Sequence, residues 1–155
     1  MRLSENFTLT EFTKSQTGLR LGIDNDPQGE HLENLRHLVN EIIQPVRSHY
    51  GRVMTINSGY RSPALNQAIG GASTSQHCRG EAADIEIPGV PNYDLALYIQ
   101  QHCEFDQLIL EFYTPGIADS GWVHVSLRRD GKNRKHTLTA MRQKGKTVYQ
   151  TGLIK

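Results

Sequence analysis

Two predicted strands decide the fold, and both lie within residues 108–127, LILEFYTPGIADSGWVHVSL. Residues 108–113 and 122–127 are rich in the β-branched and aromatic side chains that favour strands. Residues 114–121 lie between them and hold a proline and two glycines. This pattern predicts an antiparallel pair joined by a long connection.

Side chains alternate between the two faces of each predicted strand. On residues 122–127 one face is apolar, with Val123, Val125 and Leu127, and the other carries Trp122, His124 and Ser126. On residues 108–113 we expect Leu108, Leu110 and Phe112 to face the core and Ile109, Glu111 and Tyr113 to face the opposite side. If the strands pair, Glu111 and His124 lie on the same polar side of the sheet.

The first third of the chain is predicted to be mainly helical. Thr8 and Glu11 form a capping-box pattern before a short helix over residues 9–14, and residues 18–28 are predicted to be a loop. Between residues 29 and 49 an apolar stripe recurs at helical spacing: Leu32, Leu35, Leu38, Val39, Ile42, Ile43 and Val46. Pro45 lies inside that helix and predicts a kink or a new start there.

Shorter elements follow. We expect strands at residues 53–56 and 82–87, a helix from the Ser62-Pro63 cap to Ala68, and a helix over residues 93–103 capped by Asn92. Asp130-Gly131 and Lys144-Gly145 predict turns in a C-terminal hairpin. The fold class is therefore α+β, a small and mostly antiparallel sheet flanked by helices.

Length and composition favour one compact protein. At 155 residues the chain can bury a single core without disulfides, and its two cysteines, Cys78 and Cys103, are expected to be reduced thiols. The first residues have no apolar signal segment, and no run of about 20 apolar residues occurs. We expect a monomer, made in the cytoplasm without a signal peptide and without a membrane segment.

Charge is unevenly distributed although the net charge is only +1. Residues 128–155 hold nine Lys and Arg against one acid, Asp130. We therefore divide the chain into a domain over residues 1–127 and a basic hairpin extension over residues 128–155 that packs on it. Such a segment either attracts a polyanion or is a solvated surface hairpin. Its single aromatic residue, Tyr149, disfavours nucleic acid, which is bound through stacked aromatic rings.

A candidate metal site combines a short motif with a distant strand. Residues 75–85, SQHCRGEAADI, contain His77 and Asp84, and His124 lies on the predicted strand at 122–127. Two imidazoles and one carboxylate leave a coordination position open, as expected of catalytic zinc rather than structural zinc. Taken singly, a strand histidine is more often an ordinary hydrogen-bonded residue, and an aspartate that opens a strand is often only a turn former.

Three segments in order carry a resemblance to a known family: SGYRS at residues 58–62, the S-x-H-x-x-G-x-A-x-D-I pattern at residues 75–85, and WVHVS at residues 122–126. The chain resembles the M15 family of zinc D-Ala-D-Ala carboxypeptidases and peptidoglycan endopeptidases, whose fold is Hedgehog-like. It is most similar to the compact branch found in bacteriophages and bacteria. The similarity runs from about Phe7 to Leu127, so residues 128–155 lie outside it.

The resemblance implies roles for individual residues. His77, Asp84 and His124 would bind zinc, and Arg61 would lie near the substrate carboxylate or the developing oxyanion, where a guanidinium suits either task. A structural salt bridge is the alternative for Arg61. Ser75 and Gln76 either bind substrate or only satisfy backbone groups.

The general base does not follow directly from the resemblance. Many relatives have an acid three residues before the last histidine ligand, where this chain has Gly121. Glu111 on the preceding strand is the preferred base, because a strand positions a side chain more rigidly than a loop. Asp119, in the connection before the last strand, is the rival.

The expected function is hydrolysis of amide bonds in peptidoglycan stem peptides by a zinc peptidase. A protein made without a signal reaches the cell wall either as a phage lysis enzyme released by a holin-type membrane-permeabilising partner or as a virion component. Residues 128–155 would then bind an anionic cell-wall polymer. The alternative is a non-catalytic zinc module that binds the cell wall or serves as a phage structural part.

Overall fold

A six-stranded sheet organises the chain, and the computed structural model describes it over residues 1–155. The strands are β1 (Thr55–Ser58), β2 (Ala82–Glu86), β3 (Gln107–Glu111), β4 (Trp122–Ser126), β5 (His136–Gln143) and β6 (Lys146–Thr151). Their order is β1-β2-β4-β3-β5-β6, and only the β3/β5 pair is parallel. The predicted α+β class with a mostly antiparallel sheet is confirmed.

The helices are mostly short. They are α1 (Leu9–Thr13), α2 (Gln16–Leu21), α3 (Glu30–Leu38), the π-helical turn η1 (Val39–Ile43), α4 (Gln44–Tyr50), α5 (Pro63–Ala68), the 3₁₀ turn η2 (Gln76–Arg79) and α6 (Asn92–His102). No helix combines the length and the apolar composition that a membrane span requires.

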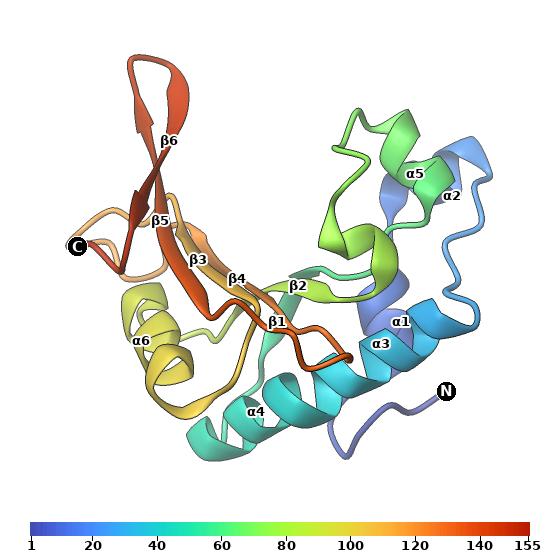
Figure 1. Ribbon diagram of the computed structural model, residues 1–155, viewed down its shortest axis with the longest axis horizontal. Helices are drawn as coiled ribbons and strands as arrows, with labels where there is room; N and C mark the ends of the chain where they lie inside the picture. The colour runs from blue at the N-terminus through green and yellow to red at the C-terminus, as the bar shows by residue number, and fades with distance from the viewer.

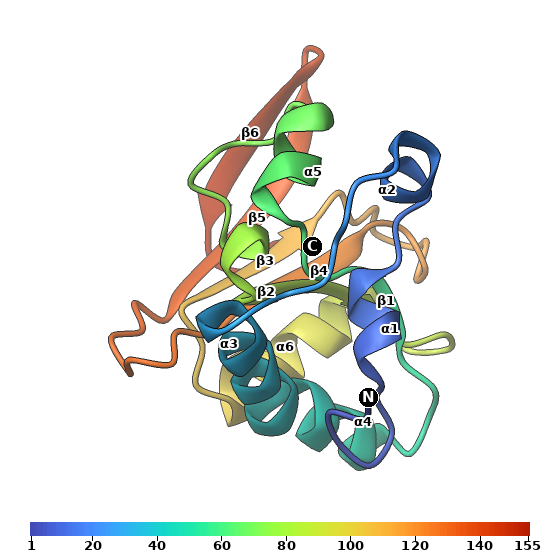
Figure 2. The same ribbon diagram turned by 90° about the vertical axis from the view of Figure 1, so that its right-hand side faces the viewer.

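The sheet is covered on one face and open over the middle of the other. Figures 1 and 2 show α3, α4 and α6 packed under the sheet, with α5 and the β5–β6 hairpin rising at two sides of the opposite face. The apolar core lies between the sheet and the covering helices and includes Ile85, Leu110, Val123 and Val125. The uncovered face of β2, β4 and β3 is therefore the place for a site.

The long helix predicted at residues 29–49 forms as a continuous α3–η1–α4 segment. Its apolar stripe is buried from Leu35 to Val46. The irregularity expected at Pro45 takes the form of the π-helical turn immediately before it, in which the Gln44 N–H bonds to the Val39 carbonyl, five residues back. Because Pro45 has no N–H to donate, one helical hydrogen bond is missing at this point. The wider turn accommodates the gap, and the helix continues through it.

Three local predictions are wrong. Residues 16–21, partly inside the predicted loop, form α2, capped by the Ser15 hydroxyl and closed by Gly22 at φ 68°. Asn92 is the first residue of α6 rather than its cap, and its side-chain amide donates to the Ser120 and Gly121 carbonyls. The first strand begins at Thr55 and not at Val53 as predicted; Val53 is exposed and lies outside the sheet.

The end of β3 departs from simple alternation. Strands β3 and β4 pair antiparallel as predicted, but Phe112 has φ 57°, which reverses the direction of the following side chains. The Phe112 ring lies against Trp122, with 5.5 Å between ring centroids, and Tyr113 packs against the core. The faces predicted for Phe112 and Tyr113 are therefore wrong, whereas Ile109 and Glu111 do face the uncovered side.

Residues 128–155 supply β5 and β6. Strand β5 pairs with β3 on one side and β6 on the other, so it is an inner strand of the sheet. The predicted turn at Lys144-Gly145 joins the two strands, with φ 51° and 76°. The boundary between 127 and 128 stays a prediction, but β5 shares one sheet with the rest of the chain.

Candidate metal centre and cleft

His77 is held in place by its backbone and by one of its ring nitrogens. It lies in η2, which the Ser75 hydroxyl caps and Gly80 closes at φ 75°. Its Nδ1 is 2.7 Å from the Gly59 carbonyl oxygen, and because a carbonyl only accepts, Nδ1 carries the proton. The Nε2 lone pair is thus free and faces the Asp84 carboxylate, 3.5 Å away.

Asp84 and His124 are brought together by the register of the sheet. They are direct partners on β2 and β4, and His124 Nδ1 lies 2.9 Å from Asp84 Oδ1. Burial raises the pKa of Asp84, but the hydrogen bond from His124 and the adjacent His77 imidazole outweigh it and hold that pKa well below its usual range. Asp84 is therefore ionised at neutral pH and able to bind a cation.

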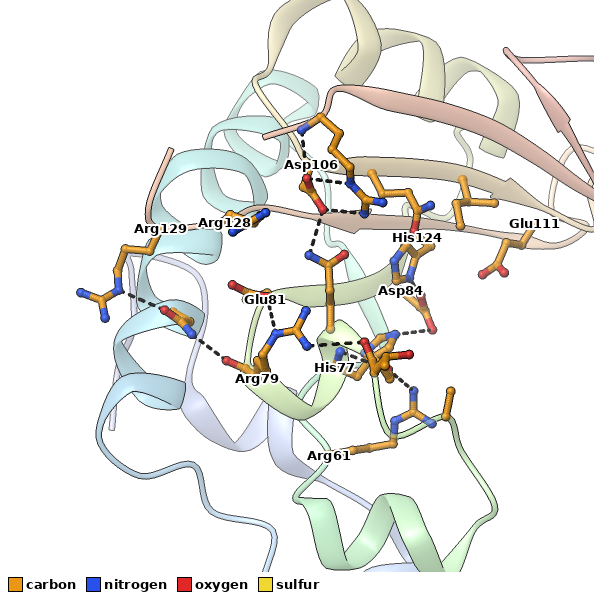
Figure 3. Close-up of a pocket in the computed structure, with 18 of the residues that line it drawn as sticks. Arg61, His77, Arg79, Glu81, Asp84, Asp106, Glu111, His124, Arg128 and Arg129 are labelled. Atoms are coloured by element: carbon orange, nitrogen blue, oxygen red, sulfur yellow. Dashed lines mark hydrogen bonds and ion pairs between the residues drawn. The ribbon is translucent and has the colours of Figure 1, made fainter. Parts of the chain in front are cut away.

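The three side chains fit a divalent metal. One ligand-capable atom from each of His77, Asp84 and His124 lies within 4.8 Å of the other two. Two imidazoles and a carboxylate match the donor set of catalytic zinc, which leaves one position for water or substrate. Figure 3 shows the three side chains converging at the floor of the cleft.

Glu111 lies beside this cluster at the end of β3. It is paired in register with Trp122, whose indole N–H donates to Glu111 Oε2 over 2.5 Å. In Figure 3 its carboxylate enters the same hollow as Asp84 and His124. Burial and the nearby negative charge of Asp84 raise the pKa of Glu111 above its ordinary value. A carboxylate with a raised pKa is suited to accept and return a proton near neutral pH.

Gly121 explains why an acid does not occupy the position three residues before His124. Its φ is 67°, and a Cβ built there would lie 2.0 Å from the Glu111 carbonyl oxygen. No side chain fits at this point without moving the backbone of β3. The same close approach brings the end of β3, with Glu111, against the start of β4.

Asp119, the rival base, is exposed and does not line the cleft. The loop that carries it is held in a closed turn by Ser120, which accepts from the Thr114 N–H and donates to the Ile117 carbonyl. The geometry therefore favours Glu111 over Asp119.

Arg61, Ser75 and Gln76 all line the cleft beside His77. The Arg61 guanidinium lies 3.4 Å from the Ser75 hydroxyl and forms no ion pair, and its Nε has no hydrogen-bond partner. The alternative of a structural salt bridge for Arg61 is thus wrong. Ser75 caps η2, while the Gln76 amide donates to Asp106.

The cleft, about 1510 Å³ in volume, also has walls that the sequence did not indicate. One wall comes from the C-terminal part of the chain, through Arg128, Arg129, Asp130, Arg134 and Tyr149. Asp106 lies beneath it and pairs with Arg134. Strand alternation already placed Trp122 on the face of His124, so its proximity to Glu111 was predictable. The Asp106–Arg134 pair joins distant segments and left no signal in the sequence.

Comparison with known proteins agrees with this site. The sequence model of one family, described as peptidase M15, matches residues 5–126, which include every residue of the metal cluster as well as Arg61 and Glu111. No curated protein matches the chain. The resemblance seen in the sequence is confirmed, and the chain belongs to the M15 peptidases, a family of zinc-dependent enzymes.

Proposed function

We propose that the chain is a zinc peptidase that hydrolyses an amide bond in the stem peptides of bacterial peptidoglycan, as a D-Ala-D-Ala carboxypeptidase or an endopeptidase. One observation carries the proposal. His77, Asp84 and His124 meet at the floor of an open cleft, and the Glu111 carboxylate lies beside them. This arrangement joins a three-ligand metal set to a candidate base.

The residues divide the chemistry among them. When bound by His77, Asp84 and His124, zinc supplies a Lewis acid that polarises a carbonyl and lowers the pKa of water. Glu111 accepts the proton of the attacking water and later gives it to the leaving nitrogen. The Trp122 indole occupies Oε2 of Glu111 and thereby leaves Oε1 for that proton.

Arg61 is proposed to bind the substrate carboxylate or to stabilise the developing oxyanion. The other arginines of the cleft are already engaged: Arg79, Arg128 and Arg134 are ion-paired, and Arg129 is bonded to a side-chain amide. The Arg61 guanidinium has neither kind of partner. A planar fork of donors suits a carboxylate through two parallel hydrogen bonds. The Ser75 hydroxyl keeps the fork beside His77.

The basic residues of the β5–β6 hairpin are proposed to hold the enzyme on an anionic cell-wall polymer. Arg142, Lys144 and Lys146 are exposed near the hairpin turn, and no acid pairs with them. Delivery to the wall by a phage, through lysis or as part of the virion, is part of the same proposal. A cluster of exposed positive charges attracts polyanions over about a Debye length.

Digestion of purified peptidoglycan tests the function. The zinc-loaded protein should release stem-peptide fragments, identified by mass spectrometry, and a chelator should abolish their release until zinc is restored. The masses identify the bond that is cut. Zinc binding without any fragment release would instead favour a non-catalytic cell-wall module.

A further inference from the structure

Asp106 is a buried carboxylate that gathers four hydrogen-bond donors. It lies just before β3, and its backbone bonds to Ser126 on one side and His136 on the other. Arg134 donates its backbone N–H and Nε to Oδ1 and its Nη2 to Oδ2, at 2.8 to 3.1 Å. The fourth donor is Nε2 of Gln76, 3.0 Å from Oδ2. Asp106 thus connects the C-terminal segment to the turn that carries His77.

This network fixes the orientation of the Gln76 amide. Burial raises the pKa of Asp106, but the hydrogen bonds from Arg134 outweigh it and hold that pKa below the usual value. The carboxylate is ionised and can only accept, so the NH₂ group of Gln76 must face it. The carbonyl oxygen Oε1 then faces away from Asp106, and it makes no hydrogen bond within the protein.

Gln76 occupies the opposite side of the metal cluster from Glu111. On β3, Ile109 is the register partner of His124; Glu111 follows it by two residues and Asp106 precedes it by three. Figure 3 accordingly shows Asp106 and Glu111 on either side of His124 and Asp84. A substrate lying over the cluster therefore passes Gln76 on the side away from the candidate base.

We propose that Gln76 Oε1 accepts a hydrogen bond from a peptide N–H of the substrate, and that Asp106 and Arg134 are positioning residues that hold the amide in this orientation. The inference rests on the proposed function, because it takes the ligand to be a peptide. A carbonyl acceptor pairs with an N–H and not with a carbonyl, and the anionic Asp106 bonded to the same amide strengthens that preference. Residues 128–155 then contribute to substrate binding through Arg134, although the family match ends at residue 126.

A double-mutant cycle tests the positioning role. The affinity of a purified disaccharide-pentapeptide fragment of peptidoglycan is measured by calorimetry on zinc-loaded protein carrying Glu111→Gln, so that binding is observed without turnover. Gln76→Ala and Arg134→Ala should each weaken binding about tenfold, the value of one hydrogen bond. In the Gln76→Ala background, Arg134→Ala should have less than about a twofold further effect. Independent, multiplying effects would overturn the proposal, since Arg134 would then act on the substrate or the fold directly.

Arg36→Ala is the matched control, because it removes an arginine from another partly exposed ion pair, with Glu33, away from the cleft. It should leave the affinity unchanged. If Arg134→Ala does not fold, Arg134→Lys retains a charge beside the buried Asp106 but cannot supply the guanidinium fork. Its cycle with Gln76→Ala must show the same non-additivity.

A second measurement requires no ligand. The side-chain amide hydrogens of Gln76, observed by nitrogen-edited NMR, should exchange slowly with solvent in the wild type and rapidly in Arg134→Lys and Asp106→Asn. Rapid exchange in the wild type would contradict the positioning. If the wild type cleaves peptidoglycan while Gln76→Ala binds the fragment normally, this inference fails and the proposed function stands. If the wild type neither binds nor cleaves, the proposed function fails and the acceptor role fails with it, while exchange still decides the positioning.

Discussion

The floor of the cleft and its C-terminal wall hold their charged groups in different ways. On the floor, Asp84, His124 and Glu111 are fixed by the register of β2, β4 and β3 and are largely removed from water. On the wall, Arg128 and Arg134 are at least one-third exposed, with 37% and 55% of their side chains accessible, and each is held by a single acid. The floor therefore sets the positions that bond cleavage requires, whereas the wall offers groups suited to recognition.

Substitutions on the floor should therefore affect catalysis most. Glu111→Gln keeps the shape of the side chain but cannot accept a proton. It should retain zinc and lower the rate of peptidoglycan cleavage by about 10²–10⁴ fold, the usual contribution of a general base. Fragment release is followed by chromatography and zinc by elemental analysis.

Asp119→Asn is the control for that experiment, because Asp119 is an exposed acid outside the cleft. Its rate should stay within about twofold of the wild type, as expected of a surface substitution remote from the site. A normal rate in Glu111→Gln together with a large loss in Asp119→Asn would transfer the base to the loop.

The second prediction concerns the close approach at the edge of the floor. Gly121→Ala adds a Cβ where the Glu111 carbonyl lies only 2.0 Å away, in addition to a positive φ. Gly131, in the wall segment, also has a positive φ, 78°, but a Cβ added there meets nothing within 4 Å. We expect about 1 kcal/mol of lost stability at Gly131 and about 3 kcal/mol or more at Gly121, measured by urea unfolding. Equal losses of stability in the two variants would show that the backbones of β3 and β4 move apart at little energetic cost.

Features that repeat along the chain were predictable from the sequence, and contacts made by single residues were not. Alternation along two strands placed His124 and Glu111 on one face, and the apolar stripe from Leu35 to Val46 predicted the long helix, because both patterns repeat over neighbouring residues. The reversal at Phe112 and the tight packing at Gly121 depend on where distant backbone passes. The Asp106–Arg134 pair joins residues 28 positions apart. Single residues of this kind have no periodic signal, so only the structure identifies them.

The third prediction concerns the junction between floor and wall. Since the pKa of Asp106 is lower in the folded chain than in the unfolded one, its ionised form stabilises the fold. That stability is fully present above the unfolded pKa of about 3.9 and is lost as the pH falls toward the folded value. Thermal unfolding between about pH 5 and 3 should therefore show a weaker pH dependence in Asp106→Asn than in the wild type. The two curves should differ in slope; parallel curves would mean that Asp106 is not stabilised by Arg134.

The smallest effect is expected at the tip of the wall. Because β5 is an inner strand, removing residues 128–155 would uncover β3, so substitution of exposed charges is the better test. Replacing Arg142, Lys144 and Lys146 with glutamine should weaken binding to intact sacculi severalfold at low salt and little at high salt. Cleavage of soluble fragments should be unchanged. Binding to sacculi that is equally strong at every salt concentration would contradict the polymer-binding role.

The position of a bound zinc ion shows whether His77, Asp84 and His124 form the metal site. Crystals grown with zinc and measured on both sides of the zinc absorption edge should show one anomalous peak per chain, in contact with His77, Asp84 and His124, and crystals of His77→Ala should lack it. A wild-type protein that is metal-free at saturating zinc, or a peak bound by other residues, would show that these three residues do not form the metal site.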